Sequence, residues 1–400
     1  MLSSTLTVLS LAIFATLTPS PVVAQSNTTL SRRDTLPQPA GQGQHAPSSP
    51  KKPSRRRRSI PETSPSNSTS EAALVKKRSK RRVNPKPRRV PLNPKFAKRS
   101  ETPKTSYSLA QASMGGYSFF DNWDFFTFSD PTHGWVNYNS REDSWQNGLV
   151  YVPSPARDTT IMRVDSWSNL PYGKLRNSVR ISSKQKVDIG SIVIADIKNI
   201  PFGPSVWPAF WMVGDNWPYG GEIDIIEGVH NSNQNQMTLH TSPGCTLSTP
   251  MQASGSILTT ECNAFENWNI GCGVQDPSPT SYGKGWNDNG GGVSVTHWDE
   301  TGISMWSFLR KDIPADIEAG KPDPSKWGTP RARFDATSCD MTKYFGSQSI
   351  VFDITLGGDW AGSNYKENGF PGTWQESIMK ASNFEQAYFE VGYVKVFSRD

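Results

Sequence analysis

Residues 221–228 have the sequence Gly-Glu-Ile-Asp-Ile-Ile-Glu-Gly, in which three carboxylates are interleaved with isoleucines. On an α-helix, the turn of about 100° per residue would point Glu222 away from Asp224 and Glu227. On a β-strand, Glu222 and Asp224 share one face because side chains alternate. One extra residue in the Ile-Ile pair, a β-bulge, would bring Glu227 to the same face. The stretch therefore predicts a bulged strand that presents three acids on one face of a sheet.

Three acids on one sheet face are costly in a core, so this face is expected to line a cleft in which the acids have different tasks. A retaining glycosidase needs one ionised nucleophile and one protonated acid, with carboxyl groups about 5–5.5 Å apart. We interpret Glu222 and Glu227 as that pair. The charge of Asp224 would raise the pKa of Glu227 and keep it protonated, while hydrogen bonding would hold Glu222 ionised. The alternative interpretation is a solvated polar face on an exposed sheet.

Aromatic residues around this stretch favour a cleft over an exposed face. Residues 207–211 read Trp-Pro-Ala-Phe-Trp, His240 lies on the next predicted strand, and Trp360 lies in a Gly-Asp-Trp-Ala-Gly segment. Sugar rings have apolar C–H faces that stack on indole rings. Trp207, Trp211, His240 and Trp360 are therefore candidate substrate-binding residues.

The part of the chain around these residues predicts an all-β domain. Short runs of β-branched and apolar residues are separated by Gly, Pro, Asn and Ser, and helical periodicity is nearly absent. Many short strands with turns between them are typical of a sandwich or barrel. The runs predicted as strands are residues 178–182, 191–197, 221–227, 236–240, 302–309, 349–356 and 389–397. Residues 258–289 and 313–330 are dense in Gly, Pro, Asn and Asp and are predicted as large loops.

These segments together resemble glycoside hydrolase family 16, in particular its fungal laminarinase-like endo-β-1,3(4)-glucanases. The acid motif of residues 222–227 is similar to the bulged form of the family signature, and the resemblance extends over residues 107–398. Further stretches that carry it are residues 207–211, 239–241, 281–283, 290–293, 322–328 and 359–362.

The resemblance implies a β-jelly-roll sandwich of two curved antiparallel sheets, with a substrate cleft on the concave face. It implies that Glu222 is the nucleophile, Glu227 the acid/base and Asp224 an assisting carboxylate, in a double displacement through a covalent glycosyl-enzyme. It also implies that His240 and the two tryptophans of residues 207–211 line the cleft.

The function implied is a secreted, endo-acting hydrolase of β-1,3- or mixed β-1,3/1,4-glucan. Two alternatives stay open. A cell-wall glucan transglycosylase would share the first half of the reaction and pass the glycosyl group to a sugar instead of water. A glucan-binding lectin without catalytic activity could use the same fold.

The sequence departs from the fungal pattern at four positions where cysteines often occur, which here are Pro204, Gly357, Phe370 and Trp374. An even number of missing cysteines fits the loss of whole disulfides. The cysteines that are present can form two bridges, in a connectivity that the sequence leaves open, and they are Cys245, Cys262, Cys272 and Cys339.

The first 104 residues differ from the rest in charge. They carry 21 Lys and Arg against 4 acidic residues, whereas residues 105–400 carry 21 against 32, so the net charges are +17 and −11. Residues 1–24 predict a secretory signal peptide. Residues 25–104 are rich in Pro, Ser, Lys and Arg and are predicted to be disordered, because they can bury little apolar surface. They are expected to be either a pro-segment that is cut at dibasic sites, of which Lys98-Arg99 is the last before the folded part, or an uncut flexible linker. Residues 105–400 are the predicted catalytic domain.

No cofactor and no metal site are expected. The five histidines are scattered, the cysteine spacings do not match a zinc site, and phosphate-loop and serine-nucleophile motifs are absent. A structural calcium ion stays open, without a ligand set that the sequence identifies. No apolar run of about 20 residues predicts a membrane span, and the signal peptide argues against nucleic acid as a partner. We expect an extracellular monomer, with or without association with the cell wall, whose partner is a β-glucan polysaccharide.

Overall fold

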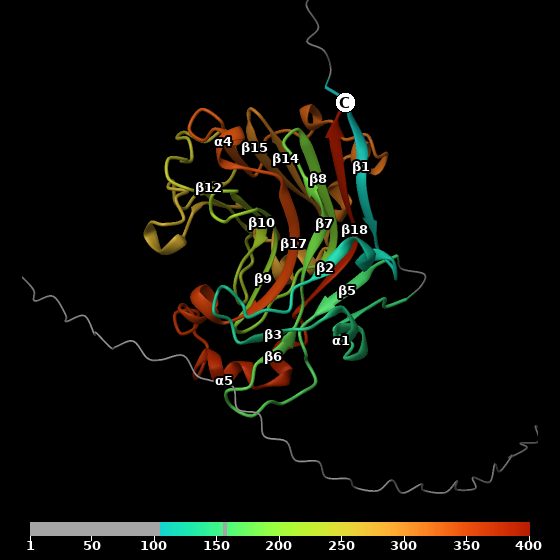
Figure 1. Cartoon of the computed structure of the whole chain (residues 1–400), viewed down its shortest axis with the longest axis vertical. Helices are drawn as coiled ribbons and strands as arrows, with labels where there is room; N and C mark the ends of the chain where they lie inside the picture. Colours follow the sequence, from blue (N-terminus) through green and yellow to red (C-terminus); the bar gives the residue numbers. More distant parts are fainter. Residues whose placement is uncertain (1–104, 155–157) are drawn as a thin grey trace, which may run out of the picture. The chain divides into compact units, whose positions relative to one another are not determined.

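The computed structural model describes residues 105–154 and 158–400, so the predicted signal peptide and the basic segment lie outside the described residues. Strands dominate the described part of the chain, where they form two antiparallel sheets of eight strands each (Figure 1). The all-β sandwich that the short alternating runs predict is therefore confirmed.

The first sheet has the strand order β16-β15-β14-β8-β18-β5-β4, and β1 pairs with β18 outside this path. Its outer face carries a small apolar cluster, in which Ile194 and Val295 of the sheet pack with Ile317 and Trp327. The predicted loop 313–330 covers this face. The strands are β1 (Tyr107–Met114), β4 (Val150–Tyr151), β5 (Thr160–Arg163), β8 (Ser191–Asn199), β14 (Gly292–Asp299), β15 (Gly302–Leu309), β16 (Ala332–Asp335) and β18 (Tyr388–Arg399).

The second sheet has the strand order β12-β13-β11-β10-β9-β17-β7-β2, with β10 and β9 near its middle. Ile223 and Ile225 of β10 are buried in the main core together with Phe210 and Phe352, whose rings stack at 4.6 Å between centroids. The opposite face of β10 is thereby left for the carboxylates. The strands are β2 (Trp123–Phe125), β7 (Arg180–Val187), β9 (Val206–Gly214), β10 (Glu222–Glu227), β11 (Gln236–His240), β12 (Ser256–Ile257), β13 (Cys272–Gln275) and β17 (Gln348–Leu356).

Short elements complete the described part of the fold. Strands β3 (Val136–Tyr138) and β6 (Arg176–Ser178) form a small parallel pair. The α-helices have at most six residues each and are α1 (Arg141–Gln146), α2 (Gly283–Asp288), α3 (Ala315–Glu318), α4 (Met341–Tyr344) and α5 (Trp374–Ile378).

Two expectations about these elements are wrong in part. The predicted loop 258–289 contains β13, which pairs with β11, and also contains α2. A strand of four residues is too short to show alternation and depends on its partner strand. The predicted strand 178–182 is divided, because β6 ends at Ser178 and β7 begins at Arg180.

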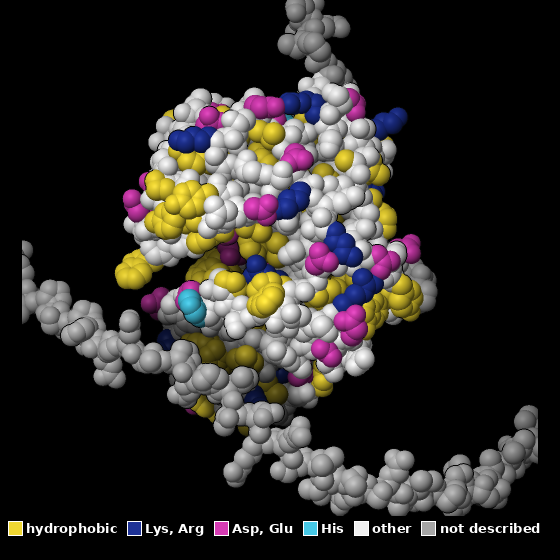
Figure 2. Space-filling view, viewed as in Figure 1, with side chains coloured by type: hydrophobic (Ala, Val, Ile, Leu, Met, Phe, Trp, Pro, Cys, Tyr) yellow, Lys and Arg dark blue, Asp and Glu magenta, His cyan; other side chains and the backbone are white. Residues whose placement is uncertain are grey.

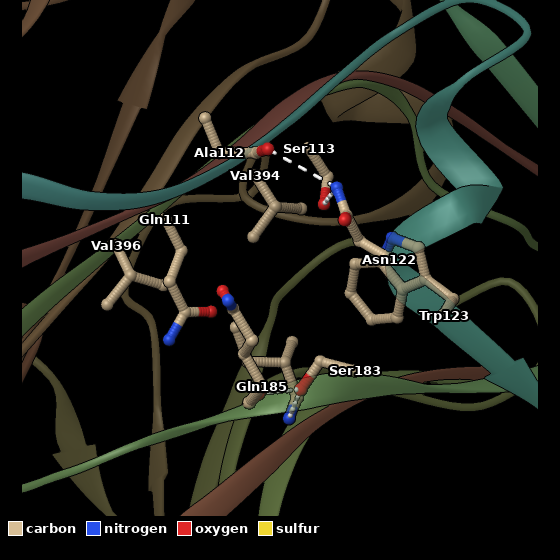
Figure 3. A pocket seen from close by; sticks show the side chains of 10 residues that line it. Gln111, Ala112, Ser113, Asn122, Trp123, Ser183, Gln185, Val394 and Val396 are labelled. Atoms are coloured by element: carbon tan, nitrogen blue, oxygen red, sulfur yellow. Dashed lines mark hydrogen bonds between the residues drawn. The ribbon is translucent and has the colours of Figure 1, made fainter.

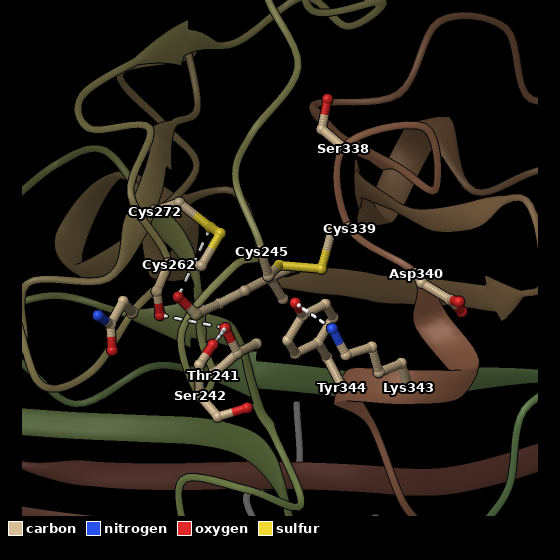
Figure 4. The surroundings of a disulfide bond; sticks show 12 residues. Thr241, Ser242, Cys245, Cys262, Cys272, Ser338, Cys339, Asp340, Lys343 and Tyr344 are labelled. Atoms are coloured by element: carbon tan, nitrogen blue, oxygen red, sulfur yellow. Dashed lines mark hydrogen bonds between the residues drawn. A yellow bond between two sulfur atoms is a disulfide. The ribbon is translucent and has the colours of Figure 1, made fainter.

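Two disulfide bonds use the four cysteines (Figure 4). Cys245 pairs with Cys339 across 94 residues of sequence, and Cys262 pairs with Cys272 across 10. All four side chains are buried. The structure thus assigns the connectivity that the sequence leaves open.

The four positions where related chains often have cysteines also lie in pairs. A Cβ atom on Gly357 would collide with the ring of Trp374, and Pro204 and Phe370 line the same surface cavity. At Gly357, the ring of Trp374 thus occupies the space that a cysteine side chain would need.

A small pocket with mixed polar and apolar lining lies where β1 and β18 pass β2 and β7 (Figure 3). Gln111, Asn122, Ser183 and Gln185 are among its lining residues, and its volume is about 40 Å³. This is room for about one water molecule and too little for a sugar ring. Among the described residues, the structure has no helix long and apolar enough to cross a membrane.

Candidate active site

A hollow lies over β9 and β10, with acidic side chains at depth and hydrophobic side chains along its edge (Figure 2). The β-bulge predicted for residues 222–227 is present here. Asp224 is opposite Trp211 of β9 and Thr238 of β11, but the register shifts before Glu227 on both sides. The bulge brings Glu227 to the face that Glu222 and Asp224 share.

Asn235 holds the bulge in place from the turn before β11. Its side-chain amide donates to the carbonyl of Ile225 at 2.8 Å and accepts from the backbone N–H of Glu227 at 3.0 Å. These backbone groups have no regular sheet partner at a bulge, and leaving them unpaired in the interior would be costly. No pattern in the sequence identifies Asn235, since it follows Asn231 and Asn233 in a turn rich in polar residues.

His240 lies beside two of the acids. It is opposite Glu222 in the β10–β11 pair, and its Nε2 lies 3.3 Å from Asp224 Oδ2 and 3.9 Å from Glu222 Oε1. Burial lowers the pKa of His240, but the hydrogen bond with Asp224 and the charges of Glu222 and Asp224 outweigh burial and raise it to about 10. The position of the imidazole between two carboxylates thus favours its protonated, cationic form.

Asn269 fixes the other side of the His240 ring. The side-chain oxygen of Asn269 lies 2.8 Å from His240 Nδ1, where it accepts the ring N–H of the imidazolium. Gly271 lies so close that a Cβ atom there would approach His240 Cε1 to 2.7 Å. The segment before β13 thus determines where the imidazolium points.

Burial and the charge of Asp224 raise the pKa of Glu222 to about 8, while the positive charge of His240 lowers it. The pKa of Glu227 is raised well above 4.5 by burial and by Asp224. Glu227 Oε1 accepts a hydrogen bond from the indole of Trp207 at 2.8 Å. Each glutamate thus has an indole beside it, Trp217 at Glu222 and Trp207 at Glu227, and the two differ in that the His240 ring lies 3.9 Å from Glu222.

The floor next to Glu222 carries a second polar group. Trp211 donates its indole N–H to Asp353 Oδ1 at 2.7 Å, and the guanidinium of Arg180 lies 5.1 Å from the Trp211 ring centre. The hydroxyl of Tyr138 donates to the other oxygen of Asp353 at 3.4 Å. Burial raises the pKa of Asp353 to about 6. Sequence reasoning missed Arg180, Asp353 and Tyr138, because each lies on a strand or pair far from the acid motif in sequence.

All seven site residues proposed from the sequence lie in one region. The three acids share one face of β10, His240 contacts two of them, Trp207 contacts the third, and Trp211 lies opposite Asp224 on β9. The ring of Trp360 packs edge-on against Trp207 at 5.7 Å. Trp360 belongs to the one-turn π-helix Gly358–Gly362, which forms a wall on the side of Glu227.

One group of ligand atoms in this region could hold a metal ion among the described residues. Atoms of Glu222, Asp224 and His240 lie within 4.8 Å of one another. His240 Nε2 faces the two carboxylates at 3.3 and 3.9 Å, and the same acids form the predicted catalytic set. The geometry therefore fits acid–base chemistry better than metal binding.

Comparison with known proteins identifies the family. The family profile described as the XgeA-like catalytic GH16 domain matches residues 123–397. A probable glycosidase of Schizosaccharomyces pombe is 43% identical over 297 residues, which are 73% of this chain and 69% of that protein. A probable endo-1,3(4)-β-glucanase of Aspergillus flavus is 38% identical over 302 residues, which are 73% of this chain and 44% of that protein. The chain thus matches less than half the length of the Aspergillus relative.

Two solved structures agree with this result. Laminarinase 16A from Phanerochaete chrysosporium, determined with two β-glucans in its donor and acceptor sites, is 35% identical with a TM-score of 0.70. An elongating family 16 β-1,3-glucosyltransferase is 39% identical with a TM-score of 0.68. Each covers 73% of this chain and is itself covered completely. The described sandwich is therefore a β-jelly roll, and the chain belongs to glycoside hydrolase family 16.

Proposed function

We propose that this chain is an endo-acting β-glucan hydrolase that cleaves β-1,3- or mixed β-1,3/1,4-linkages with retention of configuration. The observation that carries the proposal is the bulged strand, which places three carboxylates on one face with different neighbours. Glu222 has the imidazolium of His240 nearby, and Glu227 has the indole N–H of Trp207. A retaining glycosidase needs one ionised and one protonated carboxyl group. The expectation that hydrogen bonding alone keeps Glu222 ionised is wrong, because burial and Asp224 raise its pKa to about 8, and the group that favours its ionised form is the cation of His240.

In the proposed first step, the Glu222 carboxylate attacks the anomeric carbon while Glu227 gives its proton to the leaving glycosidic oxygen. The C–O bond to the leaving sugar breaks, and an ester bond to Glu222 forms. In the second step, Glu227 takes a proton from water, the water oxygen bonds to the anomeric carbon, and Glu222 leaves as a carboxylate. Asp224 assists by keeping His240 protonated and by raising the pKa of Glu227.

Single substitutions of the two glutamates test this assignment. We expect Glu222→Gln and Glu227→Gln to lower kcat on laminarin by about 10²–10⁴-fold or more, while Glu367→Gln, at an exposed position, leaves it unchanged. With added azide, Glu222→Ala should form an α-glycosyl azide by direct attack, and Glu227→Ala a β-glycosyl azide through the glycosyl-enzyme. Unchanged reducing-sugar release from the Glu222→Gln variant would show that Glu222 is not the nucleophile, whereas a wild-type protein that binds laminarin without releasing reducing sugar would be a lectin.

A transglycosylase is the second candidate, because a family 16 β-1,3-glucosyltransferase is similar to this chain over 73% of its length. Both enzymes would form the same glycosyl-enzyme, and they differ in whether water or a sugar hydroxyl takes the glycosyl group. Product analysis on laminarin, lichenan, carboxymethyl-cellulose, agarose and chitin separates them. Shorter products support the hydrolase, and products longer than the substrate support the transferase.

We also propose that the protein is secreted, on the basis of the predicted signal peptide in residues 1–24. N-terminal sequencing of the secreted protein tests this and the fate of the basic segment. A start at Ser100 supports cleavage after Lys98-Arg99, and a start at Ala97 or earlier contradicts cleavage at that site.

A further inference from the structure

Four exposed aromatic side chains lie in two loops beside the catalytic face, and we call them the aromatic rim. They are Trp217, Tyr219, Phe265 and Trp268, with exposed fractions of 44%, 59%, 60% and 98%. A side chain as large and apolar as tryptophan is seldom left fully in water unless it binds something. The proposed mechanism uses none of these four as a reacting group.

The rim is continuous with the catalytic face. The indole of Trp217 lies beside Glu222, where it lowers the pKa of that carboxyl group. The rings of Tyr219 and Phe265 lie 6.1 Å apart, which joins the loop before β10 to the loop that carries Trp268. Asn269, the next residue after Trp268, contacts His240. A glucan bound over Glu222 would therefore meet these rings where it leaves the catalytic face.

The backbone around Trp268 is strained in a way that turns its ring outward. Asn267, Trp268 and Asn269 have φ angles of 50°, 61° and 57°, so three successive non-glycine residues are left-handed. Such conformations are costly, most of all for a bulky residue, and persist only where the surroundings impose them. The Cys262–Cys272 disulfide closes the loop, and the Asn269–His240 hydrogen bond ties it to β11.

The chemistry around the rings fits a neutral sugar chain. Glu266, Asn267 and Asn269 are polar, exposed neighbours of Trp268 and can hydrogen-bond to hydroxyl groups while a sugar ring stacks on the indole. Along the chain the exposed rings alternate with amide and carboxylate groups, and Leu258 and Ile270 are also exposed in this part of the chain, so the surface offers both stacking and hydrogen-bonding groups, as a sugar chain requires.

We propose that the aromatic rim is an accessory glucan-binding site, which holds sugar units beyond those that flank the cleaved bond, with Trp268 as its main stacking surface. The inference rests on the proposed function, because it takes a β-glucan as the bound chain. An accessory site would make the affinity for glucan depend on the length of the glucan chain, because only a glucan long enough to leave the catalytic face reaches the aromatic rim.

The test measures binding in the full-length protein with Glu222→Gln, so that hydrolysis does not consume the ligand. Calorimetry with laminari-oligosaccharides of two to eight units and with laminarin compares this parent with the same protein carrying Trp268→Ala. We expect Trp268→Ala to weaken binding of laminarin and the longest oligosaccharides by about 3- to 10-fold and that of laminaribiose by much less. Trp268→Phe should restore most of the loss.

Trp167→Ala is the matched control, because Trp167 is also exposed but lies in the segment after β5. It should bind every oligosaccharide as the parent does. Equal affinities of the Trp268→Ala variant and the parent at all lengths would overturn the accessory site. If the wild-type enzyme degrades laminarin in that case, the proposed function stands without the rim. A wild-type enzyme inactive on every glucan in the panel would instead refute the proposed function.

Discussion

At the scale of single residues, the site depends on how charge is distributed around Asp224. This side chain lies between the two glutamates, raises the pKa of both, and pairs with the imidazolium of His240. A pair of identical carboxyl groups can divide into acid and nucleophile only if their neighbours differ. Here both glutamates have an indole neighbour, and the difference between them is His240, whose Nε2 lies 3.9 Å from Glu222 Oε1.

Asp224→Asn should move the pH profile of kcat/KM toward acid. The negative charge of Asp224 raises the pKa of Glu222, which must be ionised, and of Glu227, which must be protonated. Without that charge both pKa values fall, so both limbs of the bell-shaped profile shift to lower pH, by about 1 unit or more. Rates on laminarin from pH 3 to 10 measure the shift, and unmoved limbs in the variant would contradict the role of Asp224.

Asn269→Gly should change the protonation of His240 without disturbing the backbone. Glycine accepts the left-handed conformation at this position but removes the acceptor for His240 Nδ1–H. We expect His240 to titrate at lower pH, as followed by ¹⁵N NMR of the ring nitrogens, together with a lower kcat.

Asn267→Gly is the control for Asn269→Gly, because it makes the same backbone change two residues away, where no contact with His240 exists. A His240 titration that is the same in both variants would show that Asn269 does not position the ring.

At the scale of elements, the bulged β10 strand brings the acids together, and one side chain from a neighbouring turn stabilises it. Asn235 satisfies the Ile225 carbonyl and the Glu227 N–H, which the bulge removes from the regular ladder. The catalytic geometry at Glu227 thus depends on a residue that lies eight positions further along the chain.

Asn235→Ala should lower both stability and activity. It leaves two buried backbone groups unpaired, and each costs about 1–3 kcal/mol. Glu227 also loses the hydrogen bond that fixes its backbone, so kcat should fall more than the affinity for substrate. Urea unfolding and steady-state kinetics measure the two effects. Asn231→Ala, at an exposed position of the same turn, should change neither stability nor activity. An unchanged kcat in the Asn235→Ala variant would show that the geometry of the bulge does not depend on the Asn235 side chain.

At the scale of the whole molecule, the two disulfides should differ in what they contribute. In the chain-entropy account, a loop of 94 residues stabilises by about 4–5 kcal/mol and one of 10 by about 3 kcal/mol. The double variant Cys245→Ala/Cys339→Ala should therefore lose more unfolding free energy than Cys262→Ala/Cys272→Ala. The second variant should lose more activity, because its loop carries Asn269 and two residues of the aromatic rim, Phe265 and Trp268. Guanidinium unfolding and laminarin assays compare them, and the opposite order in activity would contradict this division.

The sequence by itself determined the class of fold and the acid set. Alternation along short runs is a local property, and so is the spacing of residues 222–227, which permits one shared face only on a bulged strand. The tryptophans of residues 207–211 could be placed near the acids because they precede Glu222 by only 11 and 15 residues, so that their strand is the neighbour of the acid strand in sequence and pairs with it directly.

Only the tertiary structure decided the surroundings of those acids. Asp353 and Arg180 face each other across the β17–β7 pair, and they reach the site because sheet order brings strands together that are far apart in sequence. The pairing of the four cysteines and the contact of Asn269 with His240 depend in the same way on how loops return to the sheet. No local pattern in the sequence predicts such contacts. Each contact depends on packing between distant segments, and the sequence of each segment alone is compatible with several partners.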